Sequence, residues 1–248
     1  MRILITGGNG DLAKNFTKIL RGKHYEVVTV SSSGKSAKEL LDLNSNYSSQ
    51  ILDGITHVVH CAINPELILT KIEERFIEDI YRREIKMIYI GSTSSQLTFK
   101  NRYGEYKNHV EKFVLSKNGT VITCGLIHGD QFFGQVHQIR RLLGFLPFGI
   151  EIIGTKKVYL TSIEKLSEEL LTRLEKQSFH SERIYCFDSK KMEFNHLLKD
   201  LSGRKMFTFR IKSGTLVLFL NLISFKSNRF DSDRFKGLLS DFESDFEK

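Results

Sequence analysis

Short apolar runs alternate along the first half of the chain with segments in which apolar residues recur every three or four positions. The runs favour buried strands, and the helical spacing favours amphipathic helices. The expected strands cover residues 2–6, 25–30, 56–63, 85–91 and 120–127. The expected helices cover residues 10–23, 66–83 and 103–119. Strands that alternate with helices imply parallel βαβ units, and continuous apolar strands imply a sheet covered on both faces.

The pattern changes after about residue 130. Helical spacing covers 135–146 and 162–176, and strand-like runs cover 157–162 and 183–188, before a mostly helical remainder. We therefore expect an α/β chain whose doubly wound parallel sheet occupies residues 1–130. A smaller, mostly helical lobe over residues 131–248 would fold against it, with an approximate boundary because such chains can pass between lobes.

Composition indicates a soluble globular protein, with 40% hydrophobic and 27% charged residues. The net charge of +8 comes from scattered lysines and arginines, with no interleaved aromatic motif, so we expect anionic small molecules and no nucleic acid as partners. Cys61, Cys124 and Cys186 lie far apart in apolar runs and match no metal site. Buried thiols and a strand-like beginning without a signal peptide indicate the cytoplasm.

One strongly apolar segment covers residues 214–225. A bilayer span takes about 20 apolar residues, and this segment is shorter and contains Asn221, so we expect no transmembrane helix. A buried helix, a subunit contact or a peripheral membrane contact all fit the pattern, since Arg210, Lys212 and Lys226 flank it.

A glycine-rich turn lies between the first expected strand and the first expected helix. Gly7, Gly10 and Ala13 give the spacing G-x-x-G-x-x-A. Such a turn needs a residue without Cβ, a backbone that can approach a diphosphate, and a small residue where helix and strand pack. The helix N-terminus then offers N–H groups and a positive dipole end to the phosphates. The sequence therefore predicts a nucleotide site here.

The end of the second expected strand bears on the choice of cofactor. An acidic residue there would bind the ribose 2′-hydroxyl of NAD, but the sequence reads VTVSSSGKS. Ser31, Ser32 and Lys35 could receive the additional phosphate of NADP. An ordinary polar loop explains the same residues, so NADP is preferred only mildly over NAD.

A second group of residues carries candidate chemistry. Tyr103 and Lys107 are four positions apart on an expected helix and share one face. A neighbouring ammonium favours the phenolate and brings a tyrosine toward acid–base work. Hydroxyl residues 92–95 end the preceding strand, at the edge where open α/β sheets bind ligands. Tyr106, one turn along, is interpreted as an ordinary surface-helix tyrosine, and His57 and His60 as core or hydrogen-bonded residues.

These motifs resemble the extended short-chain dehydrogenase/reductase family of nucleotide-sugar epimerases, dehydratases and reductases, which has a Rossmann-type sheet. The resembling stretches are ITGGNGDLAKNF, DLNS, VVHCAIN, YIGSTS, the Tyr–Lys pair, ITCGLIHGD and YLTSIEKLSEELLTRLE. The resemblance implies catalytic roles for Thr93, with Ser94 as the alternative, and for Tyr103 and Lys107. It also implies contacts with the cofactor. Together with the turn and strand-end residues named above, the expected cofactor-binding residues are Gly7, Asn9, Gly10, Asp11, Leu12, Ser31, Ser32, Lys35, Asp42, Leu43, Cys61, Ala62, Ile63, Tyr103, Lys107 and Leu126. It implies substrate contacts by Ser94 and His128, and no metal.

The departures from the family pattern refine the expected activity. Ser94 and Ser95 follow Thr93 where dehydratases carry an Asp-Glu pair, which disfavours dehydration. The resemblance implies hydride transfer to or from a nucleotide-linked sugar, with an NADPH-dependent 4-ketoreductase of surface-polysaccharide precursors preferred. An epimerase with retained NAD and a non-catalytic dinucleotide-binding sensor or assembly factor stay open. His128, which replaces a tyrosine, is either a second acid–base group or a pocket-wall residue, and the family's dimer-forming helices allow a homodimer.

Overall fold

A computed structural model of the 248-residue chain gives the fold. The residues it describes are 1–32, 41–45, 47–64, 66–97, 101–129, 134–145, 148–153, 157–176, 180–188, 191–203 and 208–212. The chain divides into two compact units. Unit 1 contains Met1–Ser92, Tyr106–Thr123 and Glu164–Cys186, and unit 2 contains Thr93–Glu105, Cys124–Ile163 and the described residues after Cys186.

Unit 1 is built on a six-stranded sheet in the order β10-β5-β4-β3-β1-β2. Its strands are β1 (Arg2–Thr6), β2 (Glu26–Val30), β3 (His57–His60), β4 (Lys86–Ser92), β5 (Thr120–Cys124) and β10 (Glu182–Cys186). The pairs β1–β2, β1–β3 and β3–β4 are parallel. Since β2 lies on one side of β1 and β3 on the other, the strand order reverses between β1 and β3. Open α/β sheets bind ligands beyond the carboxyl ends of the strands at such a reversal.

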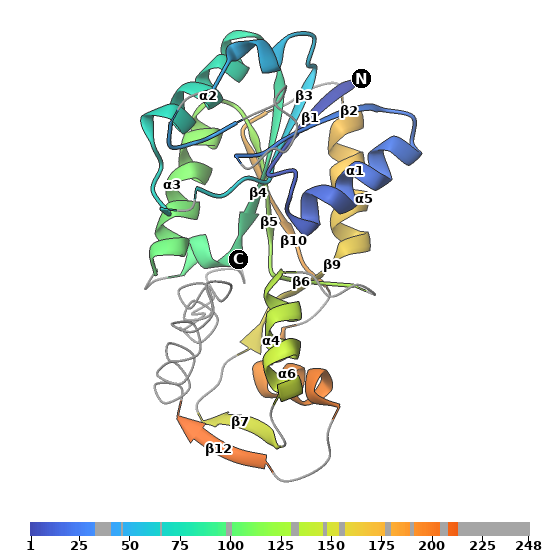
Figure 1. The fold of residues 1–248 in the computed structure, drawn as a ribbon, viewed down its shortest axis with the longest axis vertical. Helices are drawn as coiled ribbons and strands as arrows, with labels where there is room; N and C mark the ends of the chain where they lie inside the picture. The colour runs from blue at the N-terminus through green and yellow to red at the C-terminus, as the bar shows by residue number, and fades with distance from the viewer. Residues whose placement is uncertain are drawn as a thin grey trace. The chain divides into compact units, whose positions relative to one another are not determined.

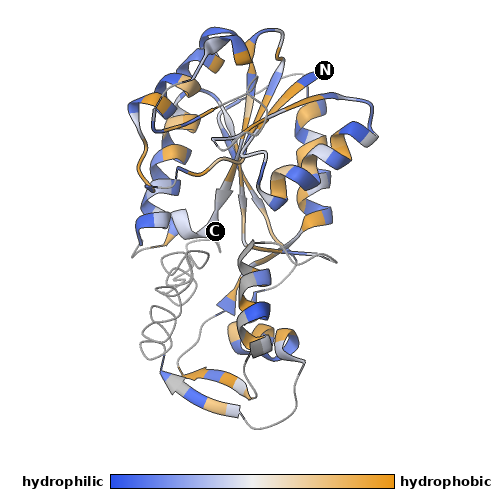
Figure 2. Cartoon of the chain, viewed as in Figure 1, coloured by the Kyte–Doolittle hydropathy of each residue, from blue (hydrophilic) through white to orange (hydrophobic). Residues whose placement is uncertain are grey.

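Helices cover both faces of this sheet, α1 and α5 on one face and α2 and α3 on the other (Figure 1). Their bounds are α1 (Asp11–Gly22), α2 (Lys71–Arg82), α3 (Arg102–Ser116) and α5 (Ile163–Glu175). Helical spacing explains the packing, because α1 buries Ala13, Phe16 and Leu20 and turns its polar residues outward. Figure 2 shows the strands of the sheet between helices that carry both hydrophobic and hydrophilic residues. The doubly wound parallel sheet is thus confirmed.

One hydrophobic cluster of unit 1 fills the space between the sheet and the helices α2 and α3. Phe76, Ile77 and Ile80 on α2 and Val110 and Val114 on α3 are fully buried against it. Helix α2 begins where the Thr70 hydroxyl accepts a hydrogen bond from the backbone N–H of Glu73. Two short 3₁₀ turns complete the connections: η1 (Ser49–Leu52) lies in unit 1, and η2 (Thr93–Gln96) begins unit 2.

Unit 2 consists of short strands and two helices. Its elements are β6 (Leu126–His128), α4 (Gly134–Phe145), β7 (Gly149–Ile153), β8 (Lys157–Val158), β9 (Leu160–Ser162), β11 (Met192–Glu193), α6 (Phe194–Ser202) and β12 (Thr208–Lys212). Parallel pairs join β6 to β9 and β7 to β12, and β8 pairs antiparallel with β11. An apolar cluster of α4, α6 and β7 that includes Leu143, Ile152 and Phe194 forms its core.

Three sequence predictions need correction. The expected helix 66–83 begins only at Lys71, where Thr70 caps it. The expected strand 120–127 breaks at Gly125, because the chain leaves β5 there and Gly125 donates its N–H to the Thr161 hydroxyl at 2.9 Å. The remainder after residue 188 contains β12, paired with an unexpected β7. Lys35 and the apolar segment 214–225 lie outside the described residues.

Candidate functional site

The glycine turn lies directly against the segment that follows β3. Gly7 has a φ of +71°, which favours glycine, and a Cβ at this position would be 3.0 Å from the Ala62 backbone nitrogen. Gly10 donates its N–H to the Gly7 carbonyl at 2.8 Å and closes the turn. The space that a side chain would fill is therefore taken by backbone.

Helix α1 starts from this turn with its N-terminus open. Gly10, the N-cap residue, is extended and provides no side-chain cap. The first N–H groups of a helix have no intrahelical partner and attract anions together with the helix dipole. Gly10 and the following Asp11 are both exposed. The turn, the open N-terminus and the reversal of strand order together fit the diphosphate of a dinucleotide.

The neighbouring predicted cofactor residues are placed as follows. The Asn9 amide donates to the Ser31 hydroxyl at 2.9 Å, which joins the turn to the end of β2. Leu12 is half-buried on α1, and Ser32 is exposed. The Asp42 carboxylate accepts hydrogen bonds from the backbone of Asn44 and the hydroxyl of Ser45, at 3.0 and 2.8 Å. Leu43 beside it is buried.

Hydrogen bonds to Thr6 of β1 fix the segment that follows β3. The Thr6 hydroxyl accepts hydrogen bonds from the backbone N–H groups of Cys61 and Ala62, at 3.1 and 3.0 Å. Cys61, Ala62 and Ile63 are half-buried. The structure therefore brings Gly7, Cys61 and Ala62 together at the carboxyl ends of β1 and β3.

Helix α3 carries Lys107 over the end of β4. The Lys107 ammonium is buried, donates to the Ile90 carbonyl at 2.9 Å and lies 4.5 Å from the centre of the Tyr89 ring. One turn further, Glu111 accepts a hydrogen bond from the Ser92 backbone at 3.1 Å. Hydrogen bonds to charged groups in the interior are strong, so these contacts fix α3 against β4.

The predicted catalytic and substrate-contacting hydroxyl residues lie directly after β4, at the start of unit 2. Thr93, Ser94 and Ser95 are buried in the turn η2. A Cβ at Gly104 would collide with the Ser94 carbonyl, so the first turn of α3 packs closely on η2. Tyr103 in that turn is half-buried and precedes Lys107 by four residues on α3. This order places a hydroxyl turn, a phenol and an amine along one continuous segment of chain.

His128 forms a pair that sequence reasoning missed. Its Nε2 lies 2.6 Å from a carboxylate oxygen of Asp188, whose other oxygen accepts a hydrogen bond from the Ser162 backbone at 3.1 Å. Burial alone would raise the pKa of Asp188, but the hydrogen bonds from His128 and Ser162 hold that pKa below its ordinary value. Leu126, two residues before His128, is buried. An acid at the end of the predicted strand 183–188 was the available signal.

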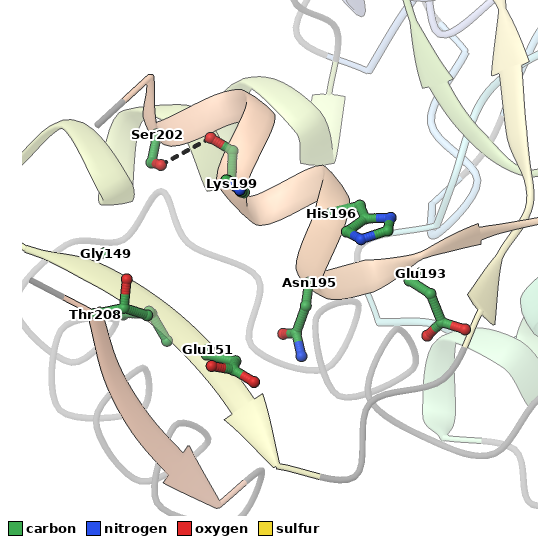
Figure 3. Close-up of a pocket in the computed structure, with 9 residues that line it drawn as sticks. Gly149, Glu151, Glu193, Asn195, His196, Lys199, Ser202 and Thr208 are labelled. Carbon is green, nitrogen blue, oxygen red and sulfur yellow. Dashed lines mark hydrogen bonds between the residues drawn. The ribbon is translucent and has the colours of Figure 1, made fainter. Parts of the chain in front are cut away.

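A separate open groove of about 640 Å³ lies within unit 2 (Figure 3). Residues from β7, α6 and β12 line it, among them Glu151, Asn195, His196 and Lys199. The Asn195 amide bonds both backbone groups of Ile152, at 2.9 and 3.0 Å, and Glu151 pairs with Arg210 at 3.0 Å. Its central polar groups are therefore already engaged in holding the lobe together.

Within the described ranges, His, Cys, Asp and Glu side chains form no group of three that could hold a metal ion. In the same part of the chain, every helix is too short or too polar to cross a bilayer.

Tyr106, His57 and His60 are all buried. Tyr106 was expected on the surface, but it is 1% exposed and its hydroxyl contacts Glu73, so that interpretation was wrong. Helix periodicity places both Tyr103 and Tyr106 near one face, and only the packing of α3 distinguishes them. His57 and His60 are buried with hydrogen-bond partners, as expected.

Comparison with known proteins gives structural neighbours only. No protein-family model and no curated protein sequence matches the chain. MoeE5 in complex with UDP-glucuronic acid and NAD is 17% identical, with 86% of each chain covered and a TM-score of 0.68. A UDP-glucuronic acid 4-epimerase from Bacillus cereus is 18% identical, with 86% of this chain and 87% of that chain covered and a TM-score of 0.68. The chain has their fold.

A third neighbour of the same fold is dTDP-4-dehydrorhamnose reductase from Bacillus anthracis in complex with NADP. It is 16% identical, with 86% of each chain covered and a TM-score of 0.67. The Rossmann-type interpretation of the sequence is thus confirmed as a fold. The matches extend over most of the chain, so unit 2 as well as unit 1 has counterparts in these enzymes.

Proposed function

We propose that this chain is an NAD(P)-dependent oxidoreductase of the extended short-chain dehydrogenase/reductase family that acts on a nucleotide-linked sugar. The observation that carries the proposal is the close fit of the Gly7 turn against Ala62, at the strand reversal and beside the open N-terminus of α1. Nucleotide-sugar complexes of proteins with the same fold support the substrate class.

The residues of α3 and η2 would perform the proton chemistry. When bound, the nicotinamide supplies or accepts the hydride. Tyr103 would exchange a proton with the sugar oxygen, and Thr93 would hydrogen-bond the same oxygen and orient it. Lys107 would favour the tyrosinate through its positive charge and hold the nicotinamide ribose. Ser94 and His128 would contact the substrate.

The polar end of β2 supports NADP over NAD. Val30 is followed by Ser31 and Ser32, so the described residues at this strand end include no carboxylate to bind a ribose 2′-hydroxyl. Solved enzymes of this fold bind either cofactor. We therefore propose 4-ketosugar reduction with NADPH, in the cytoplasm, as the reaction, and surface-polysaccharide precursors as its product class.

The test is consumption of NADPH with a panel of 4-keto sugar nucleotides. Wild-type protein is expected to turn over at least one of them, and Tyr103→Phe to lose turnover by 10²-fold or more, on the order of the contribution of a general acid. Tyr185→Phe is the matched control, since Tyr185 is 47% exposed on β10. Equal rates for wild type and Tyr103→Phe would contradict the mechanism, and no turnover would favour a dinucleotide-binding sensor.

The His128–Asp188 pair favours an epimerase as the second candidate. A histidine beside a carboxylate can serve as an additional acid–base group, which a multi-step epimerisation needs. An epimerase would be purified with NAD retained and would interconvert sugar nucleotides without net consumption of NADPH. Product analysis in the absence of added cofactor separates the two reactions.

A further inference from the structure

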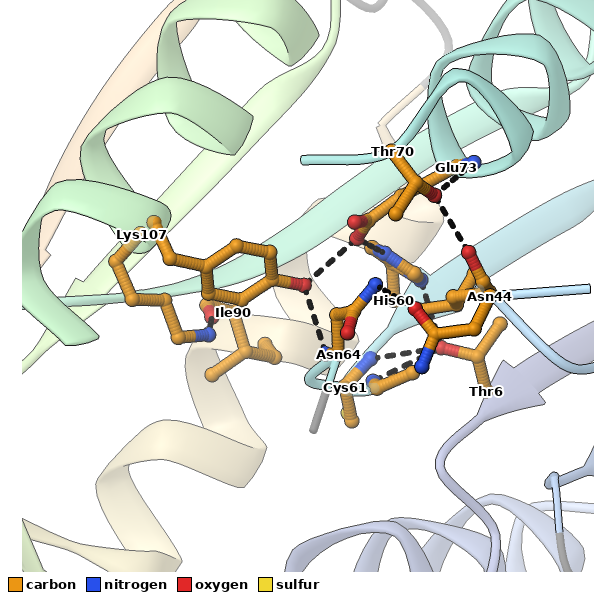
Figure 4. Close-up of polar contacts among 12 residues, drawn as sticks. Thr6, Asn44, His60, Cys61, Asn64, Thr70, Glu73, Ile90 and Lys107 are labelled. Atoms are coloured by element: carbon orange, nitrogen blue, oxygen red, sulfur yellow. Dashed lines mark hydrogen bonds and ion pairs between the residues drawn. The ribbon is translucent and has the colours of Figure 1, made fainter. Parts of the chain in front are cut away.

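A polar cluster lies inside unit 1, between the sheet and helices α2 and α3 (Figure 4). Its centre is Glu73 on α2, which is fully buried. One carboxylate oxygen, Oε1, accepts a hydrogen bond from the Tyr106 hydroxyl at 2.8 Å and lies 3.2 Å from Nε2 of His60. His60 is also fully buried, and its Nδ1 lies 2.7 Å from the Thr6 hydroxyl. Three elements, β3, α2 and α3, thus meet at one carboxylate, and β1 joins the cluster through the contact of Thr6 with His60.

The hydrogen bonds assign the protons in this cluster. The Thr6 oxygen already accepts two backbone N–H groups, from Cys61 and Ala62, so its own proton points to Nδ1 of His60. His60 Nδ1 is then an acceptor, and Nε2 carries the ring proton and donates it to Glu73. Glu73 Oε1 therefore accepts hydrogen bonds from both His60 and Tyr106. The second Glu73 oxygen has no hydrogen-bond partner among the described residues.

The same cluster holds the segment that faces the glycine turn. The Tyr106 hydroxyl accepts a hydrogen bond from the Asn64 backbone N–H at 3.1 Å. The Asn64 side chain donates to the Asn44 side chain at 2.7 Å and accepts from the Glu66 backbone at 2.8 Å. Asn64 is fully buried, so its backbone N–H depends on Tyr106 for a partner. Ala62, two residues earlier, contacts the Gly7 turn.

We propose that Tyr106 and Glu73 are positioning residues for the dinucleotide site. Tyr106 precedes Lys107 on α3, so its hydrogen bonds with Glu73 and with the Asn64 backbone set α3 relative to α2 and to the segment 61–64. The segment in turn forms the wall against which the Gly7 turn packs. A buried carboxylate is costly unless hydrogen bonds satisfy it, and here it receives them from the two elements that border the site. The inference rests on the proposed function, and neither residue is assigned contact with substrate.

The test compares Tyr106→Phe with Tyr47→Phe. Both remove one buried hydroxyl that donates to a carboxylate on α2, Glu73 in one case and Asp79 in the other. Only Tyr106 also binds the Asn64 backbone. Calorimetric titration with NADPH and with NAD is expected to give a dissociation constant raised about tenfold in Tyr106→Phe and little changed in Tyr47→Phe. Equal dissociation constants in the two variants would overturn the proposal.

Amide exchange and a second pair of variants keep the test decisive. The Asn64 amide is expected to exchange about tenfold faster in Tyr106→Phe than in Tyr47→Phe. Glu73→Gln, which retains an acceptor oxygen, is expected to bind NADPH more tightly than Glu73→Ala, and equal weakening of both would overturn the positioning role. If wild type binds neither dinucleotide, the proposed function fails. Asn64 exchange still decides then whether Tyr106 holds the segment, and unchanged exchange would overturn the proposal.

Discussion

Gly7 and Ala62 approach so closely that any side chain at Gly7 would press on the Ala62 backbone, 3.0 Å from its nitrogen and 3.1 Å from its Cα. Gly7→Ala must also adopt a left-handed conformation at φ +71°, which costs about 1–2 kcal/mol for a residue with a Cβ. We expect Gly7→Ala to lower the free energy of unfolding by about 1–3 kcal/mol and to weaken dinucleotide binding.

Urea denaturation and titration with NADPH measure these effects. Gly22→Ala is the matched control, because Gly22 ends α1 and a Cβ there would meet no atom within 4 Å. We expect the control to be neutral or slightly stabilising, by up to about 1 kcal/mol. A Gly7→Ala variant as stable as Gly22→Ala would show that the turn can relax away from Ala62.

The buried Lys107 ammonium gives a second prediction. Lys107→Met keeps most of the side-chain volume but removes the donor to the Ile90 carbonyl. The loss of a buried charged hydrogen bond is expected to cost about 1–3 kcal/mol, and turnover is expected to disappear. Lys117→Met on the same chain segment is the control, since that ammonium lies half-exposed, 3.5 Å from Glu78. Comparable stability of the two variants would contradict the assigned contact.

His57 makes stability depend on pH in the mildly acidic range. Burial, followed by the charges of Lys86 and the amino terminus, lowers the pKa of His57 to about 4, from an ordinary value of 6.5. Between these values the unfolded chain binds a proton that the folded chain does not, so stability falls as the pH drops from 6.5 toward 4. We expect a smaller slope of unfolding free energy against pH in His57→Asn. An unchanged slope would mean that other groups cause it.

Asp188 makes stability depend on pH in a more acidic range than His57 does. Since contacts with His128 and Ser162 hold its pKa below the ordinary value of 3.8, the folded state favours the ionised carboxylate. Its stabilising contribution is present above pH 3.8 and is lost as the pH falls through the lower folded value. Asp188→Asn is expected to flatten the stability profile there. The pH dependence of urea unfolding distinguishes the two windows.

Periodicity predicted the sheet and its covering helices, because each strand or helix buries its own local pattern. It could not predict β7 with β12, since Gly149 and Thr208 pair across a long stretch of sequence. Gly125 also escaped prediction, because the reason for the break is the close approach of Tyr159 rather than any local pattern. The boundary near residue 130 and the cofactor and substrate roles of individual residues stay predictions.

The sequence motifs identified candidate residues near the ends of the strands, but they did not reveal the buried side chains that hold those strand ends in place. Glu73 reads as a polar position on an amphipathic helix, yet it is buried because Tyr106 and His60 supply its partners. Such compensation depends on three elements distant in the sequence, and a single sequence does not reveal it.

The edge strand β10 reaches the sheet only after residues 93–105 and 124–163 of unit 2 have been made, and Arg183 on it pairs with buried Glu111 of α3 at 2.9 Å. During synthesis the outer edge of β5 therefore stays uncovered, and Glu111 lacks its ion pair with Arg183, until residues 164–186 leave the ribosome. Fragments that end before β10 should aggregate or recruit chaperones, because exposed strand edges pair with other chains. Completion of this domain is tied to translation of a late segment.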